Sequence, residues 1–142
     1  MSEITASGCL FYAKSTKRFL FLNRQQKQKG TWGMVGGSTH DTETPWQGLQ
    51  REIIEEIGFQ PTISKTIPLE LFVSKDTRFK FHTFVCVVDT EFVPKLNVEH
   101  SGYAWVSVNA WPLPLHEGVK KTLQNKQIER MVLINTHKVK KR

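Results

Sequence analysis

Apolar residues recur along the chain in two patterns, the alternation typical of strands and the wider spacing typical of helices. Strands are expected over 4–13, 18–24, 62–74, 78–88 and 103–108, with a short extended piece over 32–35. Helices are expected over 45–57 and 115–124, whereas the apolar stretch 128–134 is ambiguous between helix and strand. This order predicts an α/β fold with a mixed β-sheet between helices, although it does not determine the strand order.

The central helix has clear signals at both ends. Thr44 suits the N-cap position, Pro45 suits the first helical position, and Gln47 completes a capping box with Thr44. Gly58 stands where a left-handed residue ends a helix. Five apolar residues are expected to form the buried side of this helix. They are Trp46, Leu49, Ile53, Ile54 and Ile57.

Three acids share a narrow sector of the same helix. Glu52, Glu55 and Glu56 follow Arg51, and like charges at this spacing destabilise a helix by about 0.2–0.5 kcal/mol per pair. A hard divalent cation with oxygen ligands would offset this repulsion. A solvated acidic face is the alternative. Because Gly36-Gly37 permits close approach of backbone, we expect a glycine turn, a short loop and then a helix that presents carboxylates.

The same segment resembles the Nudix box. Gly37, Glu43 and the run from Arg51 to Phe59 match the box over residues 37–59 at every defined position. The resemblance extends to flanking residues, namely Asn23-Arg24, Trp32-Gly33, and Glu99 ahead of Tyr103-Ala104-Trp105-Val106. One departure is Val35, where the family often has proline before the glycine pair. This difference concerns the rigidity of the loop rather than the chemistry.

The resemblance implies an α/β/α sandwich and a hydrolase that uses Mg²⁺, with Mn²⁺ as a possible substitute. It implies metal ligands among the acids of the box, completed by a glycine carbonyl and by one later acid. These residues are Gly37, Glu52, Glu55, Glu56 and Glu99. Glu52 or Glu56 would be the general base. Arg51 lies four residues before Glu55, within reach on a helix, and is expected to orient the acids as an ion-pair partner of Glu55 and of Glu43. Glu43 is expected to be structural. Glu99 is a candidate ligand or base, with an ordinary exposed acid as the alternative.

Substrate recognition is less well defined by the sequence. Arg24 lies where relatives often place a basic residue against phosphate or base, and a surface arginine is the alternative. Trp32 is a candidate for stacking on a base, with a place in the core as the alternative. Segment 75–77 lacks the Tyr or Pro that is typical of subgroups acting on dinucleoside polyphosphates or ADP-ribose.

The substrate is therefore expected to be a nucleoside diphosphate linked to another moiety. The leading candidate is a nucleoside triphosphate, cleaved to monophosphate and pyrophosphate. The alternatives are a nucleotide-sugar, removal of pyrophosphate or a cap from an RNA 5′ end, and a non-enzymatic nucleotide- or RNA-binding module.

Composition adds to this picture without changing it. The chain of 142 residues is expected to form one domain over 1–142. Its net charge of +7 suits phosphorylated ligands and leaves RNA possible, although the basic tail 137–142 is more typical of a solvated terminus. Cys9 and Cys86 are expected to be buried free thiols. No membrane-spanning run or signal-peptide pattern is evident, so a cytoplasmic location is expected.

Overall fold

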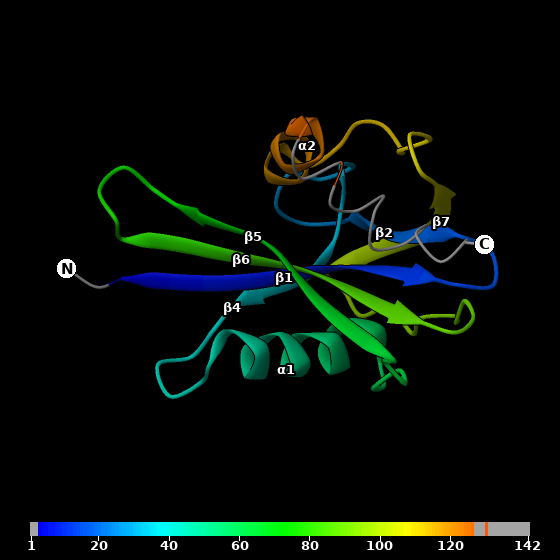
Figure 1. Ribbon diagram of the computed structural model, residues 1–142, viewed down its shortest axis with the longest axis horizontal. Helices are drawn as coiled ribbons and strands as arrows, with labels where there is room; N and C mark the ends of the chain where they lie inside the picture. The colour runs from blue at the N-terminus through cyan, green and yellow to red at the C-terminus, as the bar shows by residue number, and fades with distance from the viewer. Residues whose placement is uncertain (1–2, 127–129, 131–142) are drawn as a thin grey trace.

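The computed structural model describes residues 3–126 and 130, and over this part of the chain two helices cover opposite faces of one mixed sheet (Figure 1). The strands are β1 (Ile4–Ala13), β2 (Arg18–Arg24), β3 (Trp32–Gly33), β4 (Val35–Ser38), β5 (Lys65–Val73), β6 (Phe79–Val88) and β7 (His100–Ser107). Helix α1 (Pro45–Ile57) lies on one face and α2 (Glu117–Gln124) lies on the other. The predicted α/β/α sandwich with a mixed sheet is confirmed.

The sheet is built around β1. The long strand β6 runs parallel to β1, and β5 pairs antiparallel with the far side of β6. Strand β4 pairs antiparallel with β1 over Cys9 to Ala6, whereas β2 pairs with β1 only near the connecting turn. Strands β3 and β7 both pair with β2. The alternation predicted for β6 therefore places one set of its side chains under α2 and the other set under α1.

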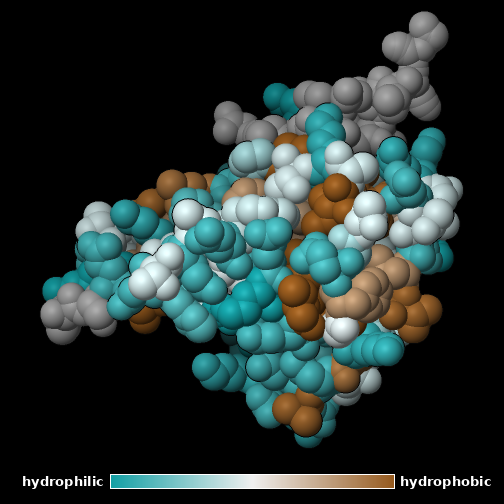
Figure 2. All heavy atoms as spheres, turned by 90° about the horizontal axis from the view of Figure 1, so that it is seen from below, coloured by the Kyte–Doolittle hydropathy of each residue, from teal (hydrophilic) through white to brown (hydrophobic). Residues whose placement is uncertain are grey.

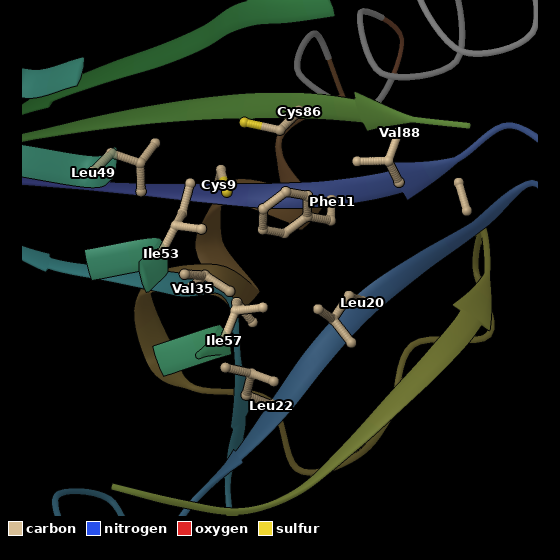
Figure 3. Close-up of a cluster of buried hydrophobic side chains, with 11 residues drawn as sticks. Cys9, Phe11, Leu20, Leu22, Val35, Leu49, Ile53, Ile57, Cys86 and Val88 are labelled. Carbon is tan, nitrogen blue, oxygen red and sulfur yellow. The ribbon is translucent and has the colours of Figure 1, made fainter. Parts of the chain in front are cut away.

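Two apolar clusters follow from this alternation. The cluster under α1 contains Leu49, Ile53 and Ile57 from the helix, and these pack on side chains of β1, β2, β4 and β6 (Figure 3). All three are fully buried, and burial of such a side chain contributes roughly 1.5–3 kcal/mol. Cys9 and Cys86 lie in the same cluster as buried free thiols, as predicted. Packing of one face of α1 therefore fixes where its other residues project.

The ends of α1 agree with the sequence. The Thr44 side chain accepts a hydrogen bond from the Gln47 backbone N–H, and the Gln47 side chain accepts one from the Thr44 backbone. Gly58 adopts the left-handed conformation with φ of 91°. One prediction for this helix was wrong, because Ile54 is 51% exposed rather than buried. On the face of the molecule that carries α1, hydrophilic residues surround small clusters of hydrophobic residues (Figure 2).

Other expectations also need correction, and two of them are strand bounds, because β5 spans Lys65–Val73 rather than 62–74 and β7 spans His100–Ser107 rather than 103–108. Gly36 and Gly37 do not form a turn but belong to β4, because their backbone pairs with Gly8 and Ser7 of β1. The second helix begins at Glu117 rather than at residue 115, because the His116 side chain caps it and Leu115 bridges to Trp32. The ambiguous stretch 128–134 and the basic tail 137–142 lie outside the described residues. Within the described part, no helix is long and apolar enough to cross a membrane.

Candidate active site

Two carboxylates of α1 lie against the glycines of β4. The Gly36 backbone N–H donates a hydrogen bond to Glu56 Oε1 at 3.2 Å, and only 3% of Glu56 is exposed. The carboxyl group of Glu52 lies over Gly37, where a Cβ atom would approach it to 2.6 Å. Glycine is therefore required at position 37 for Glu52 to occupy this place. The helix and the strand together form a cradle for a pair of acids.

Burial and crowding change the acidity of this pair. The pKa of Glu56 rises from 4.5 to about 9, mainly because the group is buried and also because of the nearby charges of Glu52 and Glu99. The hydrogen bond from Gly36 opposes this rise. Burial also raises the pKa of Glu52, which shares a hydrogen bond with Glu56. The two carboxyl groups thus hold a proton between them near neutral pH in the absence of a cation.

Arg51 connects the acids of the site. Its Nε and Nη2 atoms donate to the two carboxylate oxygens of Glu43 at 2.8 and 3.1 Å. Its Nη1 atom donates to Glu52 at 3.1 Å and to Glu55 at 3.2 Å. Its Nη2 atom also donates to the Ser38 carbonyl oxygen at 2.9 Å. Arg51 therefore ties the end of β4, the loop before α1 and two acids of the helix into one arrangement.

Glu43 lies at the outer end of this arrangement. Besides binding Arg51, its carboxylate accepts a hydrogen bond from the His40 backbone N–H at 2.7 Å. These contacts with Arg51 and His40 lower the pKa of Glu43 to about 2. Such a carboxylate remains charged under ordinary conditions and holds Arg51 in one orientation. The geometry is compatible with the structural part expected for Glu43.

Glu99 lies in a loop that is attached to the end of α1. The Asn97 side chain donates to the Glu55 carbonyl oxygen at 3.0 Å, and the Lys95 backbone N–H donates to the Ile57 carbonyl oxygen at 2.7 Å. Glu99 is near enough to Glu56 for its charge to raise the Glu56 pKa. Glu55, by contrast, keeps 51% of its side chain exposed. The structure thus brings Glu52 and Glu56 together, with Glu99 close enough to influence Glu56 and with Glu55 at the rim.

The candidate substrate-binding residues lie on β2 and β3. Arg24 ends β2, where its Nε atom donates to the Lys27 carbonyl oxygen at 2.8 Å, and its side chain lines a cavity. Trp32 is partly buried and packs against the cluster under α2. His100, opposite Arg24 on β7, is buried, and burial together with the Arg24 charge lowers its pKa to about 4.

The cavity has a volume of about 480 Å³ and lies between the sheet and α2. Gly36, Gly37 and Ser38 form one side, so the cavity reaches the strand on which the acid pair rests. Its remaining lining is apolar and aromatic with a few polar groups, and it includes Met34, Phe72, Phe81, Glu70, Thr83, His116 and Thr122. A hollow of this size and character suits a small organic ligand.

The acids fit a divalent cation by their chemistry. Glu52 and Glu56 offer carboxylate oxygens that repel each other unless a proton or a cation lies between them, and Mg²⁺ prefers such oxygen ligands. Among the described residues, however, no three acidic, histidine or cysteine side chains already converge as a complete ligand set. The residues that would hold the ion are Glu52 and Glu56, with Glu55, Glu99 and the Gly37 carbonyl at the edge of the group.

The sequence did not point to several of the cavity residues. His116 caps α2, lies 3.0 Å from Gln28 through its Nε2 atom and lines the cavity. Glu70 and Thr122 also line it and bind each other. Their separation by 52 positions explains why no local motif could reveal the pair.

Comparison with known proteins identifies the family. The NUDIX domain model matches residues 3–126, and the chain therefore belongs to the NUDIX domain family. A dihydroneopterin triphosphate diphosphatase of Haemophilus influenzae is 33% identical over 113 residues, covering 69% of this chain and 70% of that protein. The expected pyrophosphohydrolase class is thereby confirmed.

A second relative and a solved structure are also similar to this chain. A putative 8-oxo-dGTP diphosphatase 3 of Mycobacterium tuberculosis is 34% identical over 106 residues. This match covers 68% of the chain but only 47% of that protein. Among solved structures, the E. coli dihydroneopterin triphosphate pyrophosphohydrolase superposes with a TM-score of 0.65 at 24% identity, covering 95% of this chain and 99% of that one. At this identity the superposition shows a shared fold.

Proposed function

We propose that this protein hydrolyses a nucleoside triphosphate or a close analogue to the monophosphate and pyrophosphate, with Mg²⁺ bound by the acids of α1. The supporting observation is the position of Glu52 and Glu56 on the glycines of β4, which also border the cavity. The phosphates would thus lie at the acids while the base occupies the hollow. The named relatives in Haemophilus and Mycobacterium act, by their names, on triphosphates.

The side chains have distinct parts in this reaction. A divalent ion at the acids, Mg²⁺ or in its place Mn²⁺, would neutralise phosphate charge and favour ionisation of a water molecule. Glu52 or Glu56 would be the general base, because a bound cation would displace the proton that the pair otherwise shares and leave both carboxylates ionised. Arg51 holds Glu52 in place through a hydrogen bond. Arg24, which lines the cavity, would lie against the phosphates or the base of the substrate.

Product analysis tests this proposal. The protein would be incubated with each nucleoside triphosphate with Mg²⁺ or with EDTA, and monophosphate, pyrophosphate and phosphate would be separated by chromatography. We expect pyrophosphate release that requires Mg²⁺ and is lost in Glu56→Gln. Asp76→Asn is the matched control, because Asp76 lies at the tip of the β5–β6 hairpin with its carboxylate bound to Ser74. Release of orthophosphate alone would reject the proposed bond cleavage.

The net charge of +7 motivates one comparison with RNA. Binding to an RNA backbone releases counterions, so it weakens steeply with salt, with a slope of about 0.7 per neutralised phosphate on single strands. A nucleotide held by a cation and a few side chains should show a shallow dependence. We expect kcat/KM for a nucleoside triphosphate to exceed that for a short 5′-triphosphorylated RNA. Deleting residues 138–142 should change nucleotide turnover by less than about twofold. A salt-sensitive preference for the RNA would instead favour the RNA 5′-end function.

A further inference from the structure

An irregularity in β5 determines where Glu70 points. Ile67 pairs with Val85 and Pro68 with Phe84, but the next pair joins Glu70 to Thr83, so Leu69 is left without a partner. Regular alternation would place Glu70 on the same face as Pro68, toward α1. The extra residue instead turns Glu70 to the α2 face, where it lines the cavity together with Thr83. Bulges of this kind often re-aim a side chain beside an active site.

The Glu70 carboxylate is held at one oxygen. Thr122 of α2, which is 7% exposed, donates its hydroxyl to Glu70 Oε1 at 2.8 Å. No hydrogen bond to the second oxygen is present among the described residues. Met34 and Phe81 line the same cavity. A carboxylate accepts hydrogen bonds and donates none, so in a largely apolar cavity it favours ligands that present hydrogen-bond donors to it.

The position of Glu70 is fixed relative to the phosphate end of the cavity. Strand pairing aligns Gly36, Gly8, Thr83 and Glu70 in one row across β4, β1, β6 and β5. Three strand spacings separate the ends of this row, which corresponds to about 14 Å. One end is the Gly36 N–H that binds Glu56. The separation is comparable with the distance from the phosphates of a nucleotide to the far edge of its base.

We propose that Glu70 selects bases that present two adjacent donors, the ring N–H and exocyclic amino group of guanine and of other 2-amino-4-oxo rings. This inference rests on the proposed function, since it assigns the base at the same site. A carboxylate can accept both donors side by side. Adenine and cytosine present a ring nitrogen acceptor beside their amino group, and uracil and thymine present their ring N–H between two carbonyl oxygens. Each of these would place an acceptor against the Glu70 carboxylate.

The experiment compares Glu70→Gln with Glu117→Gln. Glu117 is the matched control because it lines the same cavity but is exposed in the first turn of α2. With Mg²⁺ present, kcat/KM would be measured for dGTP and dATP. We expect the wild-type protein to prefer dGTP by about 10–100-fold, as for a bidentate base contact. Glu70→Gln should lower this ratio by about tenfold or more, and Glu117→Gln should change it by less than about twofold.

A second measurement separates this inference from the proposed function. Binding of dGMP and dAMP would be followed by calorimetry for the same three proteins. If no triphosphate is hydrolysed but a dGMP preference is lost in Glu70→Gln, the proposed function fails and the base assignment stands. If turnover requires Mg²⁺ but shows no guanine preference, or the preference survives Glu70→Gln, the base assignment is overturned. Loss of the preference in Glu117→Gln would also overturn it. If Glu70→Gln has a lowered melting temperature, Glu70→Asp provides the second test. This variant keeps a carboxylate and should therefore retain the guanine preference.

Discussion

Replacement of Glu56 by glutamine should separate stability from activity. In the ion-free protein the pKa of Glu56 is about 9 in the folded state, mainly because the group is buried, whereas its ordinary value is 4.5. The folded state therefore binds this proton more tightly than the unfolded state. As the pH rises from 4.5 toward 9, the unfolded chain loses the proton first, and the free energy of unfolding decreases. Glutamine carries no such proton and removes this dependence.

The magnitude follows from the width of the pH window. One pH unit corresponds to 1.36 kcal/mol, so the interval from 4.5 to 7 sets an upper limit of about 3 kcal/mol. The expected change in the free energy of unfolding is about 1–3 kcal/mol, because Glu52 shares the proton and water reaches part of the pair. Glutamine can still accept the hydrogen bond from Gly36 and donate one to Glu52. The variant should thus retain the fold, and its stability relative to the wild-type protein should increase with pH.

Urea unfolding in EDTA at pH 5 and pH 7.5 measures this effect. We expect Glu56→Gln to gain about 1–3 kcal/mol over the wild-type protein between the two pH values. Turnover with Mg²⁺ should fall by about two orders of magnitude or more. Asp76→Asn is the control, because hydrogen bonds from Ser74 and Arg78 lower the Asp76 pKa and it does not titrate in this range. Equal pH dependence in wild-type protein and Glu56→Gln would refute the reasoning about the buried acid pair.

Three further substitutions test the surroundings of this pair. Gly37→Ala should reduce turnover of a nucleoside triphosphate with Mg²⁺ by about 100-fold, because its Cβ would lie 2.6 Å from the Glu52 carboxyl carbon. Gly102→Ala is the control and should remain active in the same turnover assay, because the nearest atom to its Cβ is 4.0 Å away. Arg51→Lys should lower kcat by about tenfold or more and the free energy of unfolding by about 1–2 kcal/mol, as measured by urea titration, because lysine cannot form the paired contacts. Glu99→Gln should lower kcat strongly with little change in KM. A decrease in kcat of less than about threefold would show that Glu99 is an ordinary exposed acid, neither ligand nor base.

Local signals in the sequence were sufficient for the bounds of α1, β1 and β2, whereas the starts of β5 and β7 were misplaced by three residues. Thr44, Pro45 and Gly58 act through the backbone of their own neighbours, so the bounds of α1 could be predicted without tertiary information. The bounds of β1 and β2 also agreed with the structure. The glycine pair was misjudged because glycine favours turns in isolation, whereas here pairing with β1 holds it in a strand.

The arrangement of the site depended on contacts between distant segments. Arg51 was expected to pair with Glu55 and Glu43, and the structure adds Glu52 and the Ser38 carbonyl oxygen. The burial of Glu56 depends on the packing of α1 on β4, which no spacing of acids reveals. Glu70 could not be found at all, because its direction depends on one unpaired residue in β5 and its partner lies on α2.

Identification of the reaction products tests the central claim most directly, namely that the acids of α1 drive cleavage of a nucleoside triphosphate. Wild-type protein, Glu56→Gln and Asp76→Asn would be incubated with dGTP and Mg²⁺, and dGMP and pyrophosphate would be quantified against time. The account predicts equal amounts of the two products from wild-type protein and Asp76→Asn, and a loss of about 100-fold in Glu56→Gln. Undiminished release of both products by folded Glu56→Gln, or release of orthophosphate in place of pyrophosphate, would contradict it.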